Sequence, residues 1–182
     1  VDNTEVAMQD LARAHRQTLT ETTVIAVGGS NGKTTTVHIL TKMCQSENVQ
    51  SIMAGNMGIP FSERVLKELK KPKQNLTYIL EISSFQMEFV LHFCPKIAVY
   101  TNLSPDHLDR HGTMGEYVNM KLKMVQNMGD DGYIVFNADD PQLIMALDGH
   151  DSKLTPFSMM RTGLIYSIDS KNIKTLTGNS LL

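Results

Sequence analysis

Apolar residues along the chain fall into two alternating patterns, short unbroken runs and longer stretches in which they recur every three or four positions. Short β-branched runs bounded by turn residues are typical of buried strands, and helical spacing is typical of amphipathic helices. The runs predict strands at residues 22–27, 51–54, 76–82, 96–103 and 133–137. The helical spacing predicts helices at residues 34–45, 61–71, 85–93, 117–128 and 141–147. The residues expected to face the core from the first two helices are Val37, Leu40, Met43, Cys44, Phe61, Val65, Leu66 and Leu69.

This strict alternation of strands and helices predicts the fold class. Nearly continuous apolar strands joined by helices indicate parallel β-α-β units, so we predict an α/β fold with a mostly parallel, doubly wound sheet flanked by helices. Residues 1–22 are interpreted as a lead-in helix, over residues 1–18, and a linker, and residues 23–182 as one central domain. Within it, residues 153–176 contain short strand-like pieces that could extend the sheet as antiparallel strands.

Composition narrows the class of protein. The chain has 182 residues, a net charge of -2 and 20% charged residues, so it lacks the basic character of a nucleic-acid-binding domain. Its apolar runs are far shorter than a membrane span, and its first residues do not have the pattern of a signal peptide. Cys44 and Cys94 form no metal-binding pattern, and we expect buried free thiols in a reducing compartment, the cytoplasm.

The first candidate for chemistry is the stretch G-G-S-N-G-K-T-T-T at residues 28–36, between a predicted strand and a predicted helix. Glycines allow the backbone to approach a ligand closely, and the helix start adds N–H groups suited to an anion. Lys33 could reach the outer phosphates of a nucleotide, and the hydroxyl of Thr34 or Thr35 could bind Mg²⁺. The common phosphate-loop pattern wants glycine where Val27 stands, so a glycine-rich turn with a chance lysine is the alternative.

Polar clusters also follow the other predicted strands. They are G-N-M-G-I-P at 55–60, E-I-S-S-F-Q at 81–86, S-P-D-H-L-D-R-H at 104–111 and F-N-A-D-D-P at 136–141. Because ligands of open parallel sheets bind beyond the carboxyl ends of the strands, we expect these clusters to border one site.

Individual residues in these clusters suggest a metal and a nucleotide. Glu81 interrupts an apolar strand, where a carboxylate must be paired or metal-bound unless it reaches solvent. Zinc at His107 and His111 lacks a second ligand pair, so Mg²⁺ with His107 as an unusual ligand is favoured, and His111 is equally well interpreted as a surface or helix-start residue. Asn137 and Asp140 could contact adenine or ribose, or could cap the next helix.

Taken together, these stretches resemble the central ATPase domain of the Mur ligase family, the ATP-dependent amide-bond-forming enzymes of peptidoglycan precursor synthesis. The loop G-S-N-G-K-T-T-T resembles that family's shortened phosphate loop, which also lacks the distant glycine, and the other clusters follow in the family's order. E-I-S-S-F-Q and D-H-L-D-R-H most resemble the branch that adds D-glutamate to UDP-N-acetylmuramoyl-L-alanine. The resemblance is strong over residues 24–141, whereas residues 8–16 resemble the lead-in helix of the branch that adds D-alanyl-D-alanine.

The resemblance implies roles for named residues. It assigns ATP to Gly29, Ser30, Asn31, Gly32, Lys33, Thr34, Thr35, Asn137 and Asp140. It assigns Mg²⁺ to Thr34, Glu81 and His107, and the UDP-sugar peptide substrate to Asn56, Ser83 and Gln86. It makes Lys33, Glu81, His107 and Lys121 the catalytic residues, with Lys121 carbamylated. Lys123 is the nearby competitor for carbamylation, and a solvated helix face is the alternative for both lysines.

The implied function is a ligase that activates the carboxylate of UDP-N-acetylmuramoyl-L-alanine as an acyl phosphate for attack by D-glutamate. Complete family members also have an N-terminal UDP-binding domain and a C-terminal amino-acid-binding domain, so we interpret the chain as a fragment, monomeric and inactive by itself. The expected partners are those domains, the UDP-sugar peptide and an amino acid, without nucleic acid or membrane. Three alternatives stay open: a non-catalytic module that binds ATP and Mg²⁺, a D-alanyl-D-alanine-adding ligase, and a folylpolyglutamate synthase-like ligase.

Overall fold

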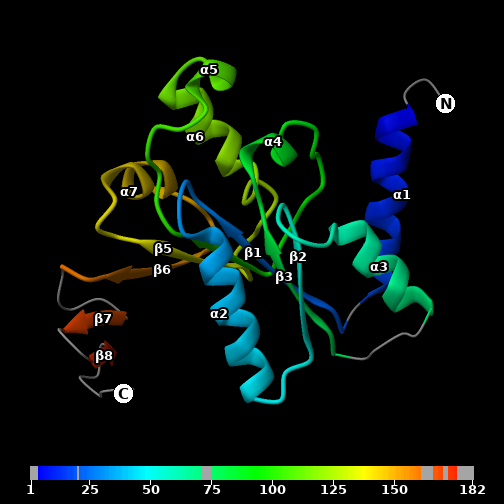
Figure 1. Cartoon of the computed structure of the whole chain (residues 1–182). Coiled ribbons are helices and arrows are strands. Elements are labelled where there is room, and N and C mark those ends of the chain that lie inside the picture. The colour runs from blue at the N-terminus through cyan, green and yellow to red at the C-terminus, as the bar shows by residue number, and fades with distance from the viewer. Residues whose placement is uncertain (1–3, 20, 71–74, 161–165, 170–171, 176–182) are drawn as a thin grey trace.

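The computed structural model describes residues 4–19, 21–70, 75–160, 166–169 and 172–175 of the chain (Figure 1). The helices are α1 (Thr4–Thr18), α2 (Lys33–Ser46), α3 (Phe61–Lys70), α4 (Ser84–Met87), α5 (Leu108–His111), α6 (Met114–Leu122) and α7 (Pro141–Leu147). The strands are β1 (Thr23–Gly28), β2 (Ser51–Gly55), β3 (Thr77–Glu81), β4 (Ile97–Tyr100), β5 (Tyr133–Asn137), β6 (Lys153–Ser158), β7 (Tyr166–Asp169) and β8 (Asn172–Thr175). Within these ranges, no helix combines the length and apolar character needed to cross a membrane.

The described strands form one sheet in the order β2-β3-β1-β4-β5-β6-β7-β8. Every neighbouring pair is parallel except β7 and β8, so the predicted α/β fold with a mostly parallel sheet is confirmed. The chain passes from β1 to β2 and β3 on one side of β1, and then crosses to β4 on the other side. Because the connections change direction around β1, the carboxyl end of β1 is the expected place for a ligand.

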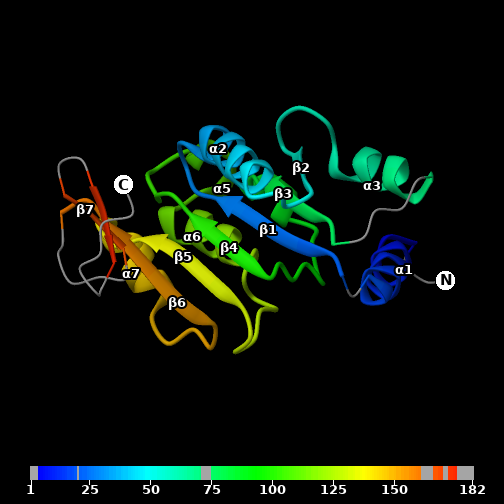
Figure 2. The same cartoon turned by 90° about the horizontal axis from the view of Figure 1, so that it is seen from below.

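Two apolar clusters cover the two faces of the sheet. On one face, Val27 and Ile79 pack against Val37 of α2. On the other face, the larger core joins strand residues such as Ala26 to residues of α4, α6 and α7, for example Val118. Successive residues of β1 thus point to opposite faces, as the period of a strand requires. In both views α1 and α3 lie at one side of the molecule and β7 at the other (Figures 1 and 2).

Two predicted helices end earlier than their apolar spacing suggested. The helix predicted at 85–93 is the short α4, after which the chain continues through turns closed by the N–H of Val90 on the carbonyl of Met87. The helix predicted at 117–128 is α6, which begins at a capping box of Thr113 and Glu116 and gives way to turns after Leu122. The apolar spacing misled because buried side chains in these following turns also pack on the sheet.

The last strands differ from the prediction in direction. Strand β6 pairs parallel to β5, β7 pairs parallel to β6, and only β8 is antiparallel, to β7. The antiparallel extension predicted for residues 153–176 is therefore wrong for β6 and β7 and correct for β8. Residues 161–165, 170–171 and 176, which belong to the same stretch, lie outside the described residues.

Four side chains that the sequence placed inside are exposed. Met43 of α2 and Leu66 and Leu69 of α3 have at least half of their surface exposed, since only one row of each helix reaches the sheet. On α3 that row is Phe61 and Val65, which pack against the larger core. Cys94 is a free thiol, as expected, but it is exposed rather than buried.

Replacing Gly55 with alanine is expected to destabilise the fold by about 2–4 kcal/mol, because backbone strain and a steric clash add together. Gly55 ends β2 with φ of +118°, and a Cβ there would lie 2.2 Å from the carbonyl oxygen of Glu81. Gly58 is the matched control, since its φ is +78° but open space surrounds it, and Gly58→Ala should cost about 1 kcal/mol. Urea unfolding of both variants measures the difference, and equal losses would contradict the clash.

Candidate active site

The loop between β1 and α2 is shaped by glycine and held by side chains from a neighbouring strand end. Gly29 and Gly32 have φ of +128° and +81°, backbone that other residues rarely adopt. The backbone N–H of Asn31 donates to Oδ1 of Asn102 over 2.9 Å. The hydroxyl of Thr101 donates to the carbonyl of Asn31 over 2.7 Å. The loop therefore has a fixed shape before any ligand arrives.

Ser30 ties this loop to two further elements. Its Oγ lies 2.9 Å from the phenol oxygen of Tyr117 on α6 and accepts the N–H of Ser104 over 3.0 Å. Burial raises the pKa of the Tyr117 phenol, so this group stays protonated and can donate. Tyr117 itself is fully buried. The loop, the segment after β4 and α6 thus form one connected unit.

Helix α2 begins at Lys33 with free N–H groups. Its N-cap residue is Gly32, no side chain caps it, and its first turn contains no acidic residue. The Nζ of Lys33 donates to the carbonyl of Ser30 over 2.7 Å, which keeps the ammonium against the loop. Backbone N–H groups, the positive end of a helix dipole and an ammonium together form a site for phosphate groups.

Glu81 is buried at the end of β3, with 4% of its surface exposed. Its Oε2 accepts the hydroxyl of Thr34 over 2.8 Å, and its Oε1 accepts the amide of Asn56 over 3.2 Å. Glu81 stands beside Val27 of β1 and Gly55 of β2 in the register of the sheet, so it sits at the rim where the strands end. The alternative of a solvent-exposed carboxylate is therefore wrong.

Lys121 is buried on α6, with 6% of its surface exposed, so the solvated helix face considered for it is wrong. Its Nζ donates to the carbonyl of Gly29 over 2.7 Å and lies 4.6 Å from the ring centre of Tyr117. Burial, together with the charge of Lys33, lowers the pKa of Lys121 from 10.5 to about 8, while Asp106 acts in the opposite direction. A buried amine of this kind is neutral in a useful fraction of molecules near pH 8.

His107 lies on the turn that precedes α5. It has φ of +50°, a left-handed conformation that is uncommon outside glycine, and its side chain is exposed. Its Nε2 lies 3.5 Å from Oδ2 of Asp106, and its ring lies 4.8 Å from that of Phe85. The turn thus presents an accessible imidazole beside the loop.

Ser83 and Gln86 form the capping box of α4. The N–H of Ser83 donates to Oε1 of Gln86 over 2.9 Å, and Ser83 Oγ accepts the N–H of Gln86 over 3.4 Å. These two predicted substrate residues therefore also set the start of the helix, and Gln86 is exposed.

Asn137 and Asp140 lie further along the sheet, at the end of β5. Oδ1 of Asp140 accepts the N–H of Gln142 as the N-cap of α7, and its Oδ2 accepts the N–H of Leu103 over 2.6 Å. Oδ1 of Asn137 accepts the N–H of Asp139 over 2.9 Å. Helix capping, the alternative considered for Asp140, is present, and its second oxygen additionally fixes the segment after β4.

A cavity of about 110 Å³ brings five of the predicted site residues together, namely Lys33, Asn56, Ser83, His107 and Lys121. Its lining comprises Lys33, Asn56, Ser83, Ser84, Phe85, Asp106, His107, Tyr117 and Lys121. Glu81 and Thr34 line a neighbouring cavity of about 160 Å³. The other predicted site residues line neither of these two cavities; they are Gly29, Ser30, Asn31, Gly32, Thr35, Gln86, Asn137 and Asp140.

Sequence reasoning missed the residues that hold the loop. Thr101, Asn102, Ser104 and Tyr117 contact it, yet none was given a role in the site, although Ser104 begins one of the predicted polar clusters. A usable signal was present, because three of these four polar side chains directly follow the predicted strand at 96–103 or lie at its end. Their contacts with residue 30 or 31 join positions more than 60 apart in the chain, which the sequence pattern alone does not reveal.

The oxygen-rich surroundings of Glu81 fit a hard cation such as Mg²⁺. Its buried carboxylate faces the hydroxyl of Thr34 and the amide of Asn56. The carboxylate of Glu81 and the hydroxyl of Thr34 could each supply one oxygen ligand. Within the described ranges, no three residues among His, Cys, Asp and Glu come together as a ready metal cluster. A cation bound here would therefore need further oxygen ligands, from water or a phosphate, to complete its coordination shell.

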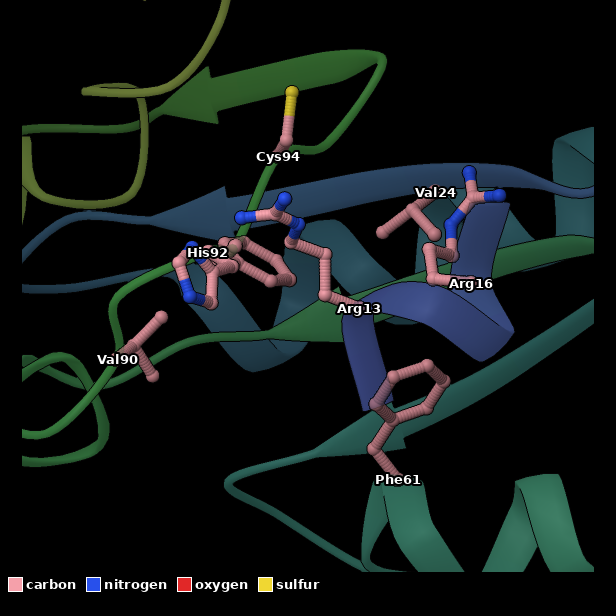
Figure 3. Close-up of a pocket in the computed structure, with 8 residues that line it drawn as sticks. Arg13, Arg16, Val24, Phe61, Val90, His92 and Cys94 are labelled. Atoms are coloured by element: carbon pink, nitrogen blue, oxygen red, sulfur yellow. The ribbon is translucent and has the colours of Figure 1, made fainter. Parts of the chain in front are cut away.

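A third cavity, of about 230 Å³, lies at the opposite, amino end of the strands (Figure 3). Apolar side chains such as Val24, Phe61 and Val90 line it together with Arg13 and Arg16 of α1. Arg16 donates to the carbonyls of Leu19 and Thr22, so its guanidinium closes the end of α1. None of the predicted site residues lies in this cavity.

A parallel sheet, a glycine-shaped loop after its central strand and an uncapped helix start define a nucleotide-binding α/β domain of the phosphate-loop class. Residues 27–180 match the family model described as the Mur ligase middle domain. The chain belongs to this family.

Relatives in sequence agree with this assignment, and solved structures share the fold. The UDP-N-acetylmuramoylalanine--D-glutamate ligase of Shouchella clausii is 39% identical over 140 residues, which are 77% of this chain and 30% of that protein. A UDP-N-acetylmuramoyl-L-alanyl-D-glutamate--2,6-diaminopimelate ligase superposes with a TM-score of 0.70 at 25% identity, covering 88% of this chain and 38% of that one. The MurF ligase from Thermotoga maritima in complex with ADP gives 0.72 at 20% identity, covering 98% and 44%. The chain thus spans less than half the length of each.

Proposed function

We propose that this chain is the ATP-binding middle domain of a ligase that joins an amino acid to a UDP-sugar carboxylate in peptidoglycan precursor synthesis. The proposal rests on the contacts made at the phosphate loop. Lys33 and Lys121 donate to the loop carbonyls of Ser30 and Gly29, and Glu81 accepts the hydroxyl of Thr34. D-Glutamate is the proposed amino acid, on the basis of the D-glutamate ligases that the chain resembles in sequence.

The chain's own residues suit the transfer of a phosphoryl group to a carboxylate. In the proposed first step, a substrate carboxylate oxygen attacks the γ-phosphorus of ATP, the bond to the β-phosphate oxygen breaks, and an acyl phosphate and ADP form. Lys33 and the N–H groups at the start of α2 would hold the phosphate oxygens in line, and Glu81 with Thr34 would hold Mg²⁺. When bound, Mg²⁺ supplies positive charge that offsets the charge on those oxygens.

In the second proposed step, an amine attacks the carbonyl carbon of the acyl phosphate, the carbon–oxygen bond to phosphate breaks, and the proton lost by the amine leaves with the phosphate as the amide bond forms. No nucleophilic side chain is required, so the polar lining of the 110 Å³ cavity has only to bind and orient. Asn56, Ser83 and Gln86 are proposed to border the UDP-sugar peptide. His107 is proposed as a ligand of a second Mg²⁺, and Asn137 and Asp140 as contacts of adenosine.

Lys121 is proposed to react with CO₂: its neutral amine attacks the carbon, an N–C bond forms and a proton leaves, giving a carbamate. Only the neutral amine reacts, and a pKa of about 8 makes that form abundant. We expect the carbamate carbon signal in ¹³CO₂ NMR to grow as pH rises from 7 to 9. It should vanish in Lys121→Arg and persist in Lys123→Arg. A signal that follows Lys123 would contradict the assignment.

The first test of the proposal is calorimetry of ATP binding to this chain with and without Mg²⁺. Binding that strengthens with Mg²⁺ is expected, and GTP serves as the comparison nucleotide. Absence of ATP binding by a folded sample would overturn the proposal that this chain holds the nucleotide without help from other domains.

The non-catalytic alternative, a module that only binds ATP and Mg²⁺, needs a second test. The chain can replace the middle domain of the Shouchella clausii ligase, which is 39% identical over the matched residues. A working middle domain gives substrate-dependent phosphate release in that fusion, whereas a binding-only module gives ATP binding without release.

The remaining proposals concern the rest of the protein. We propose that residues 1–22 connect an N-terminal UDP-binding domain to the central domain at 23–182, and that a C-terminal domain supplies the amino acid. We propose that the whole is a cytoplasmic monomer that needs all three parts for activity. Size-exclusion chromatography with light scattering checks the monomer.

A further inference from the structure

The rings of Phe85, His107, His111 and Tyr117 lie together at the proposed active site. Three of them line the 110 Å³ cavity, and the fourth, His111, has no role in the reaction described above. The rings of Phe85 and His111 are nearly parallel, at 11° and 5.5 Å between centres. His111 also lies 5.3 Å from Tyr117, and Phe85 lies 4.8 Å from His107. His111 is therefore in contact with rings from two different helices.

His111 also makes a hydrogen bond that fixes its ring. Its Nε2 lies 2.9 Å from the Oγ of Ser84, and Ser84 is only 3% exposed. Ser84 is the first residue of α4, a helix of four residues that is too short to be stable by itself. The position of α4 must therefore come from tertiary contacts, and His111 supplies two of them, to Ser84 and to Phe85.

These contacts connect three segments that carry proposed site residues. α4 begins with the capping box of Ser83 and Gln86, and His107 lies on the turn from which α5 leads to His111. Tyr117 joins α6 to Ser30 of the phosphate loop. The bond between Ser84 and His111 links residues 27 positions apart, so no local rule of helix or turn fixes the distance between these segments.

We propose that His111 is a positioning residue that holds the start of α4 in place for the UDP-sugar peptide, and that it is not a metal ligand. This inference rests on the proposed function. The Nε2 of His111 is engaged by Ser84, while the exposed His107 on the preceding turn stays accessible.

Changing His111 should weaken binding of the UDP-sugar peptide and leave ATP binding nearly unchanged. Besides Tyr117, Thr101 and Asn102 hold the phosphate loop, so the loop should keep its shape and ATP binding should change little when the contact to α4 is lost. Ser83 and Gln86 depend on α4 directly, so the UDP-sugar peptide should bind less tightly. A residue needed only for general stability would weaken both.

The first experiment uses the 182-residue chain. The first readout is the imidazole ¹⁵N–¹H spectrum, in which the His111 signals are identified because they disappear in His111→Phe. In Ser84→Ala, the Nε2 signal of His111 should shift, because this nitrogen loses its hydrogen-bond partner. His92→Phe is the matched control, because His92 pairs with Asp10 at the opposite end of the sheet. An unchanged His111 spectrum in Ser84→Ala would overturn the proposal.

The second experiment measures kinetics in the fusion with the Shouchella clausii domains. His111→Phe keeps the stacked ring and loses the nitrogen, and Ser84→Ala loses the hydroxyl. Each should raise KM for the UDP-sugar peptide about tenfold, with KM for ATP within twofold of the unchanged fusion. The double variant should be no worse than either single one, because both break the same bond. The proposal would be overturned if the two effects multiplied in the double variant, or if KM for ATP rose as much as KM for the UDP-sugar peptide.

The two experiments separate this inference from the proposed function. If the unchanged chain binds no ATP, the proposal that it holds the nucleotide by itself fails, while the imidazole spectra still report whether Ser84 binds His111. If ATP binds and the His111 signals are the same in Ser84→Ala as in the unchanged chain, the proposed function stands and the positioning role is wrong.

Discussion

Replacing Lys33 with alanine is expected to weaken Mg²⁺-dependent ATP binding by about 100-fold, which corresponds to about 2.7 kcal/mol. Lys33 is the lysine of the phosphate loop, and its Nζ lies 2.7 Å from the carbonyl of Ser30. Hydrogen bonds from an ammonium to phosphate contribute about 1.5–3 kcal/mol each, so loss of one or two accounts for the effect. Calorimetry on the purified chain measures it directly.

The matched control for Lys33 is Lys42, an exposed lysine on the same helix. Lys42→Ala removes the same charge without touching the loop, so ATP affinity should stay within twofold. Thermal unfolding of both variants shows whether the fold survives. If Lys33→Ala binds ATP as tightly as the unchanged chain, the loop is not the phosphate site, whatever the family resemblance.

Replacing Glu81 with glutamine is expected to abolish the strengthening of ATP binding by Mg²⁺. The change keeps the size of the side chain and removes the negative charge that faces Thr34 and Asn56. In the fusion with the Shouchella clausii domains, phosphate release should fall about a thousandfold, because Mg²⁺ is no longer held where it offsets the charge on the phosphoryl oxygens. Calorimetry with and without Mg²⁺ gives the first readout and phosphate release the second.

Stability provides the internal control for Glu81. A buried carboxylate costs free energy that a neutral amide does not, so Glu81→Gln should not lower the free energy of unfolding by more than about 1 kcal/mol. Glu63→Gln, on the exposed surface of α3, should leave Mg²⁺ dependence unchanged. An intact Mg²⁺ effect in Glu81→Gln would place the cation elsewhere.

Much of the architecture was predictable because it depends on local patterns. Each of the first five strands was identified within a few residues, since buried parallel strands are short apolar runs ended by turn residues. The loop at 28–36 was identifiable because its glycines, lysine and threonines stand in a fixed order at a strand-to-helix junction. Such features require no knowledge of which segments meet.

The errors share one physical cause, which is that burial is decided by partners distant in sequence. Two helices were predicted to continue past Met87 and Leu122, where the chain in fact forms turns. Apolar residues keep a helical spacing there because residues of these turns also pack against the sheet. Met43, Leu66 and Leu69 have the spacing of core residues, but in the described part of the chain at least half of each side chain stays exposed. The direction of β6 depended on the crossover that precedes it, which apolar alternation does not encode.

By itself, the sequence determined the alternation of strands and helices, the position of the phosphate loop and the residue types that follow each strand. Only the tertiary structure decided that Glu81 is buried against Thr34 and Asn56, that Lys121 reaches Gly29 across 92 positions, and that His111 holds Ser84. Local patterns fix backbone conformation through short-range sterics and periodic burial. The pairing of distant side chains, and with it the lowered pKa of Lys121, exists only after the sheet brings the strand ends together.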